Sequence, residues 1–185
     1  MKTFNYKQFL IKEGVYDPGI FKAYFLAGGP GSGKSFVTSS AFAGLGLKLV
    51  NSDSVLEKYL KDAGLSLKMP DSEKSLRDPL RDRAKVTTQA RLDLYLRGRL
   101  GVIIDSTARD VAKIGRQQKL FKILGYDTYM IFVNTSLEVA LDRNKKRDRT
   151  VPEFVTRKSH KEIQSKMGIL HKMFTPGNFY IIDNN

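Results

Sequence analysis

Short apolar runs alternate with amphipathic stretches along most of the 185-residue chain. Runs rich in β-branched, leucine and aromatic residues predict strands, whereas apolar residues that recur every three or four positions predict helices. Strands are expected at 21–27, 47–51, 101–105, 128–133 and 179–182, and helices at 33–43, 53–63, 71–97, 110–124, 136–146 and from about 152. Five strands separated by helices predict an α/β sandwich with a five-stranded, mostly parallel sheet.

The length and composition fit one globular domain. Hydrophobic residues make up 41% of the chain and charged residues 28%, which is ordinary for a soluble protein. We expect an N-terminal extension over 1–22 and a single domain over 23–185. No apolar run approaches the roughly 20 residues that span a bilayer, so we expect no membrane partner. The absence of cysteine excludes disulfides, cysteine nucleophiles and thiolate zinc sites, and it suits a cytoplasmic protein.

The chain is strongly basic, because 32 Lys and Arg residues against 19 Asp and Glu residues give a net charge of +13. Such an excess raises the local concentration of polyanions and speeds encounters with them. It does not by itself separate nucleic-acid binding from the handling of small nucleotides. Charge therefore keeps both classes of partner open.

The sharpest motif follows the first predicted strand. Its residues match the spacing G-x-x-x-x-G-K-[ST] in full, and they are Gly28, Gly29, Pro30, Gly31, Ser32, Gly33, Lys34 and Ser35. Glycines let the backbone approach a phosphate closely, and the helix that follows directs its N–H groups and dipole at the anion. In such a loop Lys34 reaches the β- and γ-phosphates, and the Ser35 hydroxyl binds Mg²⁺. We therefore predict that this loop, with Phe36 beside it, binds ATP and Mg²⁺.

Acidic residues follow the second and third predicted strands, at Asp53 and Asp105. The carboxyl ends of parallel strands share one edge of a sheet, so both carboxylates are expected near the phosphate loop. Asp53 is either the N-cap of the next helix or the general base that takes a proton from an acceptor hydroxyl. Asp105 is either the N-cap of the helix that begins near residue 110, or a partner of Mg²⁺ or of the substrate. Thr107 and Arg109 follow it and are candidates for contact with the substrate.

A basic run, LDRNKKRDR, closes the helix after the fourth predicted strand. Arg143 and Arg147 are four residues apart and would share one helical face. Such a run is often only a solvated surface. Over a triphosphate, however, fixed guanidinium groups stabilise the charge that develops on the transferred phosphoryl group. We therefore expect a lid around 143–152 in which at least one arginine is catalytic.

The predicted helix over 71–97 carries an apolar stripe and a basic ridge. The stripe is expected to face the core and consists of Leu76, Leu80, Ala84, Thr87 and Leu94. The ridge consists of Arg77, Arg81 and Lys85, and it is either a solvated face or a track for a polyanion. Neither histidine has metal-ligand spacing, so we expect structural roles for His160 and His171.

Four features occur in a fixed order: the phosphate loop, the Asn51-Ser52-Asp53 step, the strand end over 102–107, and the segment Arg143-Asn144…Arg147…Val151-Pro152. Together they resemble the polynucleotide kinase and zeta-toxin group of P-loop kinases. The similarity extends from about residue 22 to the C-terminus, and the short phage-type polynucleotide 5′-kinase domain is most similar. The resemblance implies a three-layer fold of the nucleoside-kinase type, with the P-loop strand central and a helical lid.

The resemblance also implies roles for individual residues. Lys34 and Ser35 match the phosphate lysine and the Mg²⁺ hydroxyl, Asp53 matches the catalytic base, and Arg143 and Arg147 match the lid arginines. Asp105 falls at the acidic strand-end position.

The expected activity is transfer of the ATP γ-phosphate to a hydroxyl of a nucleic acid, either a 5′-hydroxyl or a modified base. Two alternatives stay open. The acceptor is instead a nucleotide, nucleoside or nucleotide sugar, or the chain is a nucleotide-binding module without catalysis. Leu56 favours a small acceptor, because polynucleotide kinases carry an arginine at that position, three residues after the base. A phage-encoded enzyme of this kind would act in the host cytoplasm.

Overall fold

The computed structural model describes residues 17, 19–146, 151–174 and 177–185. Most of the expected N-terminal extension lies outside these residues, as does Arg147 of the expected lid. The strands are β1 (Lys22–Ala27), β2 (Lys48–Val50), β3 (Val102–Asp105), β4 (Asp127–Asn134) and β5 (Phe179–Asp183). The helices are α2 (Lys34–Ala41), α3 (Ser52–Asp62), the short 3₁₀ helix η1 (Asp71–Glu73), α4 (Lys74–Arg97), α5 (Val111–Ile123), α6 (Leu137–Lys145) and α7 (Glu153–Met173).

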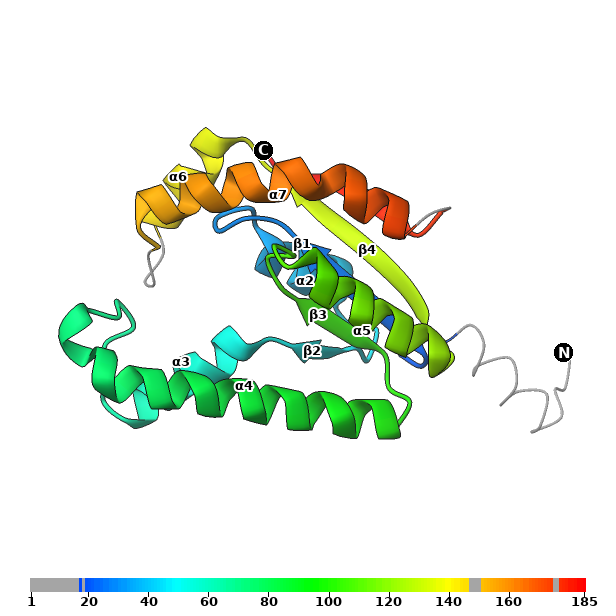
Figure 1. The fold of residues 1–185 in the computed structure, drawn as a ribbon, viewed down its shortest axis with the longest axis horizontal. Coiled ribbons are helices and arrows are strands. Elements are labelled where there is room, and N and C mark those ends of the chain that lie inside the picture. The colour runs from blue at the N-terminus through cyan, green and yellow to red at the C-terminus, as the bar shows by residue number, and fades with distance from the viewer. Residues whose placement is uncertain (1–16, 18, 147–150, 175–176) are drawn as a thin grey trace, which may run out of the picture.

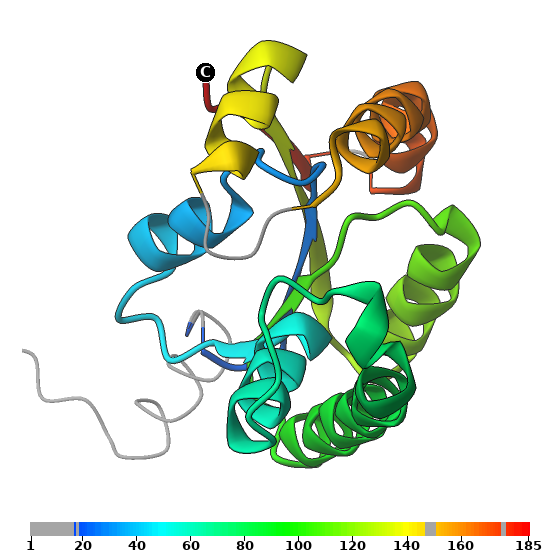
Figure 2. The same cartoon turned by 90° about the vertical axis from the view of Figure 1, so that its left-hand side faces the viewer.

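The five strands form one sheet in the order β2-β3-β1-β4-β5, and every pairing is parallel. The strand that leads into the phosphate loop, β1, is central, as the resemblance implied. Parallel strands require a crossover between them, so helices cover both faces of the sheet (Figures 1 and 2). This arrangement confirms the predicted α/β P-loop kinase fold.

Side chains of β1 alternate between two apolar cores. Ala23, Phe25 and Ala27 join a core that α4, α5 and α7 complete, through residues such as Leu92, Phe121 and Leu170. Leu26 enters the opposite core with Val37 of α2. The near-continuous apolar runs of the central strands therefore reflect burial on both faces. None of the described helices is long and apolar enough to cross a membrane.

Helices α3 and α4 pack together beside the sheet and share a small core of their own (Figure 1). That core is formed by Val55, Leu56, Leu60 and Ala84. The guanidinium of Arg83 lies 5.0 Å from the centre of the Tyr59 ring, and the Tyr59 hydroxyl is 2.9 Å from that of Thr87. The two helices thus form a unit with its own packing, attached at one edge of the sheet.

The stripe predicted on α4 is only partly correct. Ala84 is buried, but Leu76 and Leu94 are each 63% exposed, whereas Arg77 is only 8% exposed. The reason is that the Arg77 guanidinium turns back on the connection before the helix, where Nη1 donates to the Met69 carbonyl at 2.6 Å. The apolar stem of Arg77 therefore lies on the buried side of the helix, where the predicted stripe had placed Leu76.

Candidate active site

The phosphate loop connects β1 to α2 at the centre of the carboxyl edge of the sheet. Gly31 and Gly33 have φ angles of 79° and 88°, in the left-handed region that glycine adopts without strain. A Cβ at Gly31 would lie 2.1 Å from the Ala140 carbonyl oxygen, and one at Gly33 would lie 2.0 Å from Asn184 Nδ2. Both positions therefore require glycine, for conformation and for space.

Two polar side chains of the loop suit an anion. Lys34 Nζ donates to the carbonyl oxygens of Gly28 and Gly29, at 2.7 and 3.1 Å, which holds the ammonium group against the loop. Ser32 Oγ is buried and has no hydrogen-bond partner among the described residues. A buried hydroxyl without a partner is costly, so it fits a loop that receives further hydrogen bonds when a phosphate is bound.

Residues distant in sequence hold the loop in place. The Ser32 carbonyl oxygen accepts hydrogen bonds from Thr135 Oγ1 at 3.0 Å and from Asn184 Nδ2 at 2.9 Å. Thr135 therefore does not cap α6, although it stands three residues before Glu138 in a capping-box spacing. The cap is Ser136, whose side chain accepts from Val139 N. The carboxyl ends of β4 and β5 thus fix the conformation of the loop after β1.

The Asp53 carboxylate is exposed in the first turn of α3, at the end of β2. It is not the N-cap, because Asn51 fills that position and its Oδ1 accepts from Asp53 N at 2.7 Å. The same Asn51 donates through Nδ2 to Asp105 Oδ2 at 2.7 Å, which ties the ends of β2 and β3 together. Asp105 is not a cap either, since Asp110 caps α5. The N-cap alternative is therefore wrong for both carboxylates.

Arg143 lies against the phosphate loop. Its Nη1 donates to the Asn184 carbonyl oxygen at 2.7 Å, and the same atom would be 3.7 Å from a Cβ at Gly33. The next residue, Asn144, is buried and bonds both backbone groups of Val151: Oδ1 accepts from Val151 N at 3.0 Å, and Nδ2 donates to Val151 O at 2.6 Å. The predicted partner arginine, Arg147, lies outside the described residues.

The remaining candidates are placed less centrally. The Arg109 guanidinium pairs with Glu162 at 2.9 Å and donates to Ser159 Oγ at 3.4 Å, so both of these contacts are with α7. Thr107 is half-buried in the loop after β3. Phe36 is 66% exposed on α2, one residue after Ser35. Contact of these three side chains with a ligand stays a prediction.

Three residues of the site carry no local sequence signal: Thr135, Asn184 and His160. His160 Nε2 is 2.8 Å from the Thr135 carbonyl oxygen, and the backbone of His160 passes close to Gly29, so the histidine supports the loop from α7. Among the described residues no group of three or more His, Asp or Glu side chains forms a metal cage. Unlike Thr135, Asn184 and His160, Asn51 has a local signal in the sequence, because it precedes a predicted helix, where an asparagine is typical of an N-cap.

Comparison with known proteins decides the family. A family model described as an AAA domain matches residues 24–170, which is most of the chain. The chain belongs to this family. The match covers the phosphate loop, both carboxylates and Arg143 of this P-loop kinase domain. No curated protein matches the chain.

Solved structures share the fold of this AAA-domain P-loop kinase at low identity. A candidate kinase from Chloroflexus aurantiacus is 16% identical with a TM-score of 0.55, and the match covers 89% of this chain and 86% of that one. The AvrRxo1-ORF1:-ORF2 complex with ATP is 16% identical with a TM-score of 0.67, and the match covers 95% of this chain and 58% of that one. A chain of the Pnkp1/Rnl/Hen1 RNA repair complex is 21% identical with a TM-score of 0.61, and the match covers 82% of this chain and 46% of that one. The chain therefore spans about half the length of the last two.

Proposed function

We propose that the protein is a kinase that transfers the γ-phosphate of ATP to a hydroxyl group of a nucleic acid. The observation that carries the proposal is the arrangement of three kinds of group at one edge of the sheet. The glycine loop with Lys34 follows β1, Asp53 follows β2 at the same edge of the sheet, and Arg143 Nη1 lies 3.7 Å from the Gly33 Cβ position. The family assignment and the ATP complex of AvrRxo1 support the choice of nucleotide.

In the proposed reaction the acceptor hydroxyl oxygen attacks the γ-phosphorus, and the bond from that phosphorus to the β,γ-bridging oxygen breaks. Asp53 takes the hydroxyl proton, and ADP leaves with the bridging oxygen. Lys34 and the loop N–H groups hold the phosphates, while Arg143 offsets charge on the transferred group. Each residue thus acts on a different part of one phosphoryl transfer.

The residues present fit Mg²⁺. This ion retains several waters and binds through one or two carboxylates together with substrate phosphates, so a cage of protein ligands is not required. Ser35, whose hydroxyl is exposed at the start of α2, and Asp105, at the end of β3, would hold it. When bound, the ion supplies positive charge to the β- and γ-phosphate oxygens.

The acceptor class separates the two enzymatic hypotheses. The Pnkp1 complex, which has the same fold in an RNA repair assembly, supports a nucleic acid, and the +13 charge is compatible with either class of acceptor. Leu56 favours a small acceptor, since it is 2% exposed in the α3–α4 core and offers no charge to a substrate phosphate. Labelled phosphate on 5′-hydroxyl or base-hydroxymethylated oligonucleotides would support the first, and ADP release only with metabolites would support the second.

The test of the chemistry is Asp53→Asn. We expect kcat to fall about 10²- to 10⁴-fold, the usual contribution of a general base, while ATP binding stays nearly intact. Asp62→Asn is the matched control, because Asp62 is an exposed aspartate in the last turn of the same helix. Lys34→Ala should weaken ATP binding as well as turnover. An Asp53→Asn enzyme with full turnover would contradict the proposed mechanism.

A further inference from the structure

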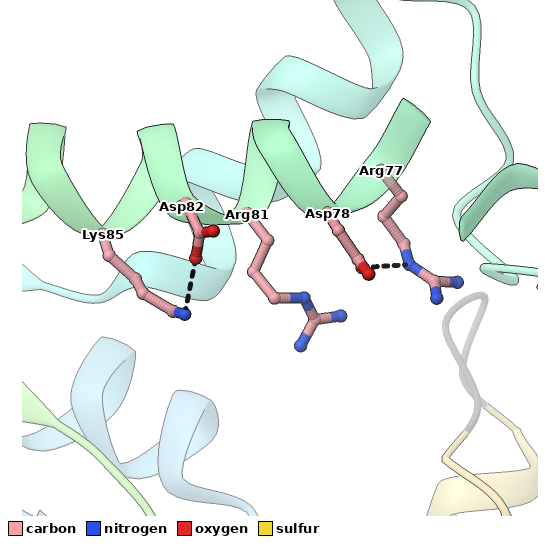
Figure 3. A pocket seen from close by; sticks show the side chains of 5 residues that line it. All are labelled: Arg77, Asp78, Arg81, Asp82 and Lys85. Atoms are coloured by element: carbon pink, nitrogen blue, oxygen red, sulfur yellow. Dashed lines mark hydrogen bonds and ion pairs between the residues drawn. The ribbon is translucent and has the colours of Figure 1, made fainter. Parts of the chain in front are cut away.

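A row of charged side chains on α4 lines a hollow of about 450 Å³. The row alternates in sign and consists of Arg77, Asp78, Arg81, Asp82 and Lys85. Figure 3 shows all five on one side of the helix, with the yellow ribbon of α6 across from them. Figure 1 shows the same opposition, with α3 and α4 below the sheet and α6 and α7 above it. The row therefore lies on the side of α4 that faces α6, the helix that carries Arg143.

The three basic residues of this row, which we call the α4 ridge, are spaced four residues apart. Arg77 is only 8% exposed, so Arg81 and Lys85 are the members that a ligand can reach, and at 1.5 Å per residue they are separated by about 6 Å along the helix axis. A single phosphate is contacted by groups that converge on one point, whereas the α4 ridge is extended. The spacing of Arg81 and Lys85 fits a ligand that carries successive negative charges in a line.

One end of the α4 ridge is fixed. The Arg77 guanidinium donates to the Met69 carbonyl oxygen at 2.6 Å and to that of Pro70 at 3.4 Å. Arg81 Nη2 lies 3.5 Å from Met69 Sδ, so both arginines are positioned by the connection between α3 and α4. Side chains that are already held in place lose less entropy when a ligand binds.

The carboxylates in the row leave Arg81 available. Lys85 pairs with Asp82 at 2.8 Å, and Arg77 lies 3.7 Å from Asp78, whereas Arg81 forms no direct ion pair among the described residues and acts on Asp82 only through its charge. The Lys85 ammonium, through its hydrogen bond and charge, lowers the pKa of Asp82. The Lys85–Asp82 pair is solvent-exposed, so it is weak, screened by salt, and readily exchanged for a phosphate contact.

We propose that the α4 ridge binds the sugar–phosphate backbone of a single-stranded nucleic acid and leads it to Asp53. The inference rests on the proposed kinase function and names the surface that holds its acceptor. The bound chemistry is a run of phosphodiesters, since an extended row of cations matches a polymer better than a mononucleotide. Specificity for base sequence is not expected, because the ridge contacts the backbone.

The test measures binding without turnover. A 3′-fluorescein single strand of about 12 nucleotides, within the site sizes of single-strand binders, is titrated by anisotropy at several salt concentrations. Arg81→Gln and Lys85→Gln should each weaken binding, by about tenfold for Arg81→Gln as the loss of one charge-assisted hydrogen bond. Each should also reduce the slope of log K against log salt by roughly 0.7. Arg91→Gln, an exposed arginine of α4 outside the hollow, should change neither value.

Equal losses in all three variants would overturn the proposal, since they would show a general charge effect. Unchanged binding by Arg81→Gln and Lys85→Gln would also overturn it, as would a mononucleotide that competes as well as the strand. Arg77 is left intact because its buried bonds stabilise the α3–α4 connection. The kinase function is tested separately, by comparing ADP release from the wild-type protein and from the Asp53→Asn variant. The kinase function can therefore fail while strand binding on the ridge persists, and the reverse outcome is equally distinct.

Discussion

At the scale of single residues, the phosphate loop depends on Asn184. Its side-chain amide donates to the Ser32 carbonyl oxygen at 2.9 Å, and its own carbonyl oxygen accepts from Arg143 Nη1 at 2.7 Å. The Thr135 hydroxyl oxygen also lies 3.1 Å from this carbonyl oxygen. One residue thus connects the loop that receives phosphate with the arginine that faces it. Asn184 is a positioning residue, since it acts through these two groups.

We expect Asn184→Ala to reduce the free energy of unfolding by about 1 kcal/mol, the typical net value of one hydrogen bond. ATP affinity should fall several-fold, because the loop loses one of its two anchors. Urea unfolding and nucleotide titration measure the two effects. Asn178→Ala is the control: Asn178 Nδ2 makes a comparable bond to Thr128 O, at 3.0 Å, just before β5 begins. Equal ATP affinities in the two variants would contradict a special role for Asn184.

Sequence alone identifies the residues proposed for chemistry better than the residues that support them. Lys34 and Ser35 are recognisable because the glycine spacing, the strand before and the helix after are all local. Asn184 and Thr135 contact Ser32 across 152 and 103 residues, and no pattern of neighbours indicates such a pairing. The role of Asp53 as a general base stays a prediction, whereas the alternative that it caps α3 is wrong, because the structure gives that position to Asn51.

At the scale of elements, α6 and α7 are joined by a clamp from one buried amide. Asn144 bonds both the N–H and the C=O of Val151, and it directly follows Arg143. The end of α6 and the residue that precedes α7 are therefore held at a fixed separation. The two hydrogen bonds of Asn144 therefore help to hold α6, the helix that carries Arg143, in place beside the phosphate loop.

Asn144→Ala should lower the free energy of unfolding by about 1–3 kcal/mol, because buried backbone groups lose their partners. It should also lower kcat, since the position of Arg143 relaxes. Chemical unfolding and steady-state kinetics at a temperature where the variant is folded test both points. Gln118→Ala removes another buried amide, which donates to Met173 O at 2.8 Å between α5 and α7. That control should lose stability with kcat unchanged, and a matching loss of kcat would refute the clamp.

Element boundaries were predictable where caps and apolar periodicity agree, as for the strands and for α5. The buried face of a helix was less predictable, as on α4, where burial follows tertiary contacts. Arg77 is drawn inward by the Met69 carbonyl and Leu76 is left exposed, so the helical pattern gave the wrong inward face for its first turn. Propensity and period describe one helix, whereas packing depends on what lies beside it.

At the scale of the whole molecule, a central β1 places the phosphate loop between two flanking units. Helices α3 and α4 lie on one side and α6 and α7 on the other (Figure 1). The alternation of strands and helices was enough to predict a parallel sheet. The order of its strands was not readable from that alternation, because every order leaves the same pattern of buried positions. The central place of β1 came from the resemblance of motifs to P-loop kinases.

ATP with Mg²⁺ should stabilise the whole domain. At a concentration one hundred times Kd, binding adds about 2.7 kcal/mol, which corresponds to a rise in Tm of roughly 5–10 °C for a chain of this size. Lys34→Ala should remove most of the rise. Sulfate at equal ionic strength is the control, since any anion screens a net charge of +13. A shift as large with sulfate as with ATP would contradict specific nucleotide binding, and differential scanning fluorimetry decides between them.

The bond from Asn184 to Ser32 spans 152 residues, and this separation has a consequence for folding. Contacts between distant segments close late, because their loop entropy is lost before the contact repays it. The phosphate loop can therefore take its final shape only after β5 has joined β4. An immature chain, even with β1 and α2 in place, captures nucleotide poorly, so ATP is engaged mainly by molecules that have completed their sheet.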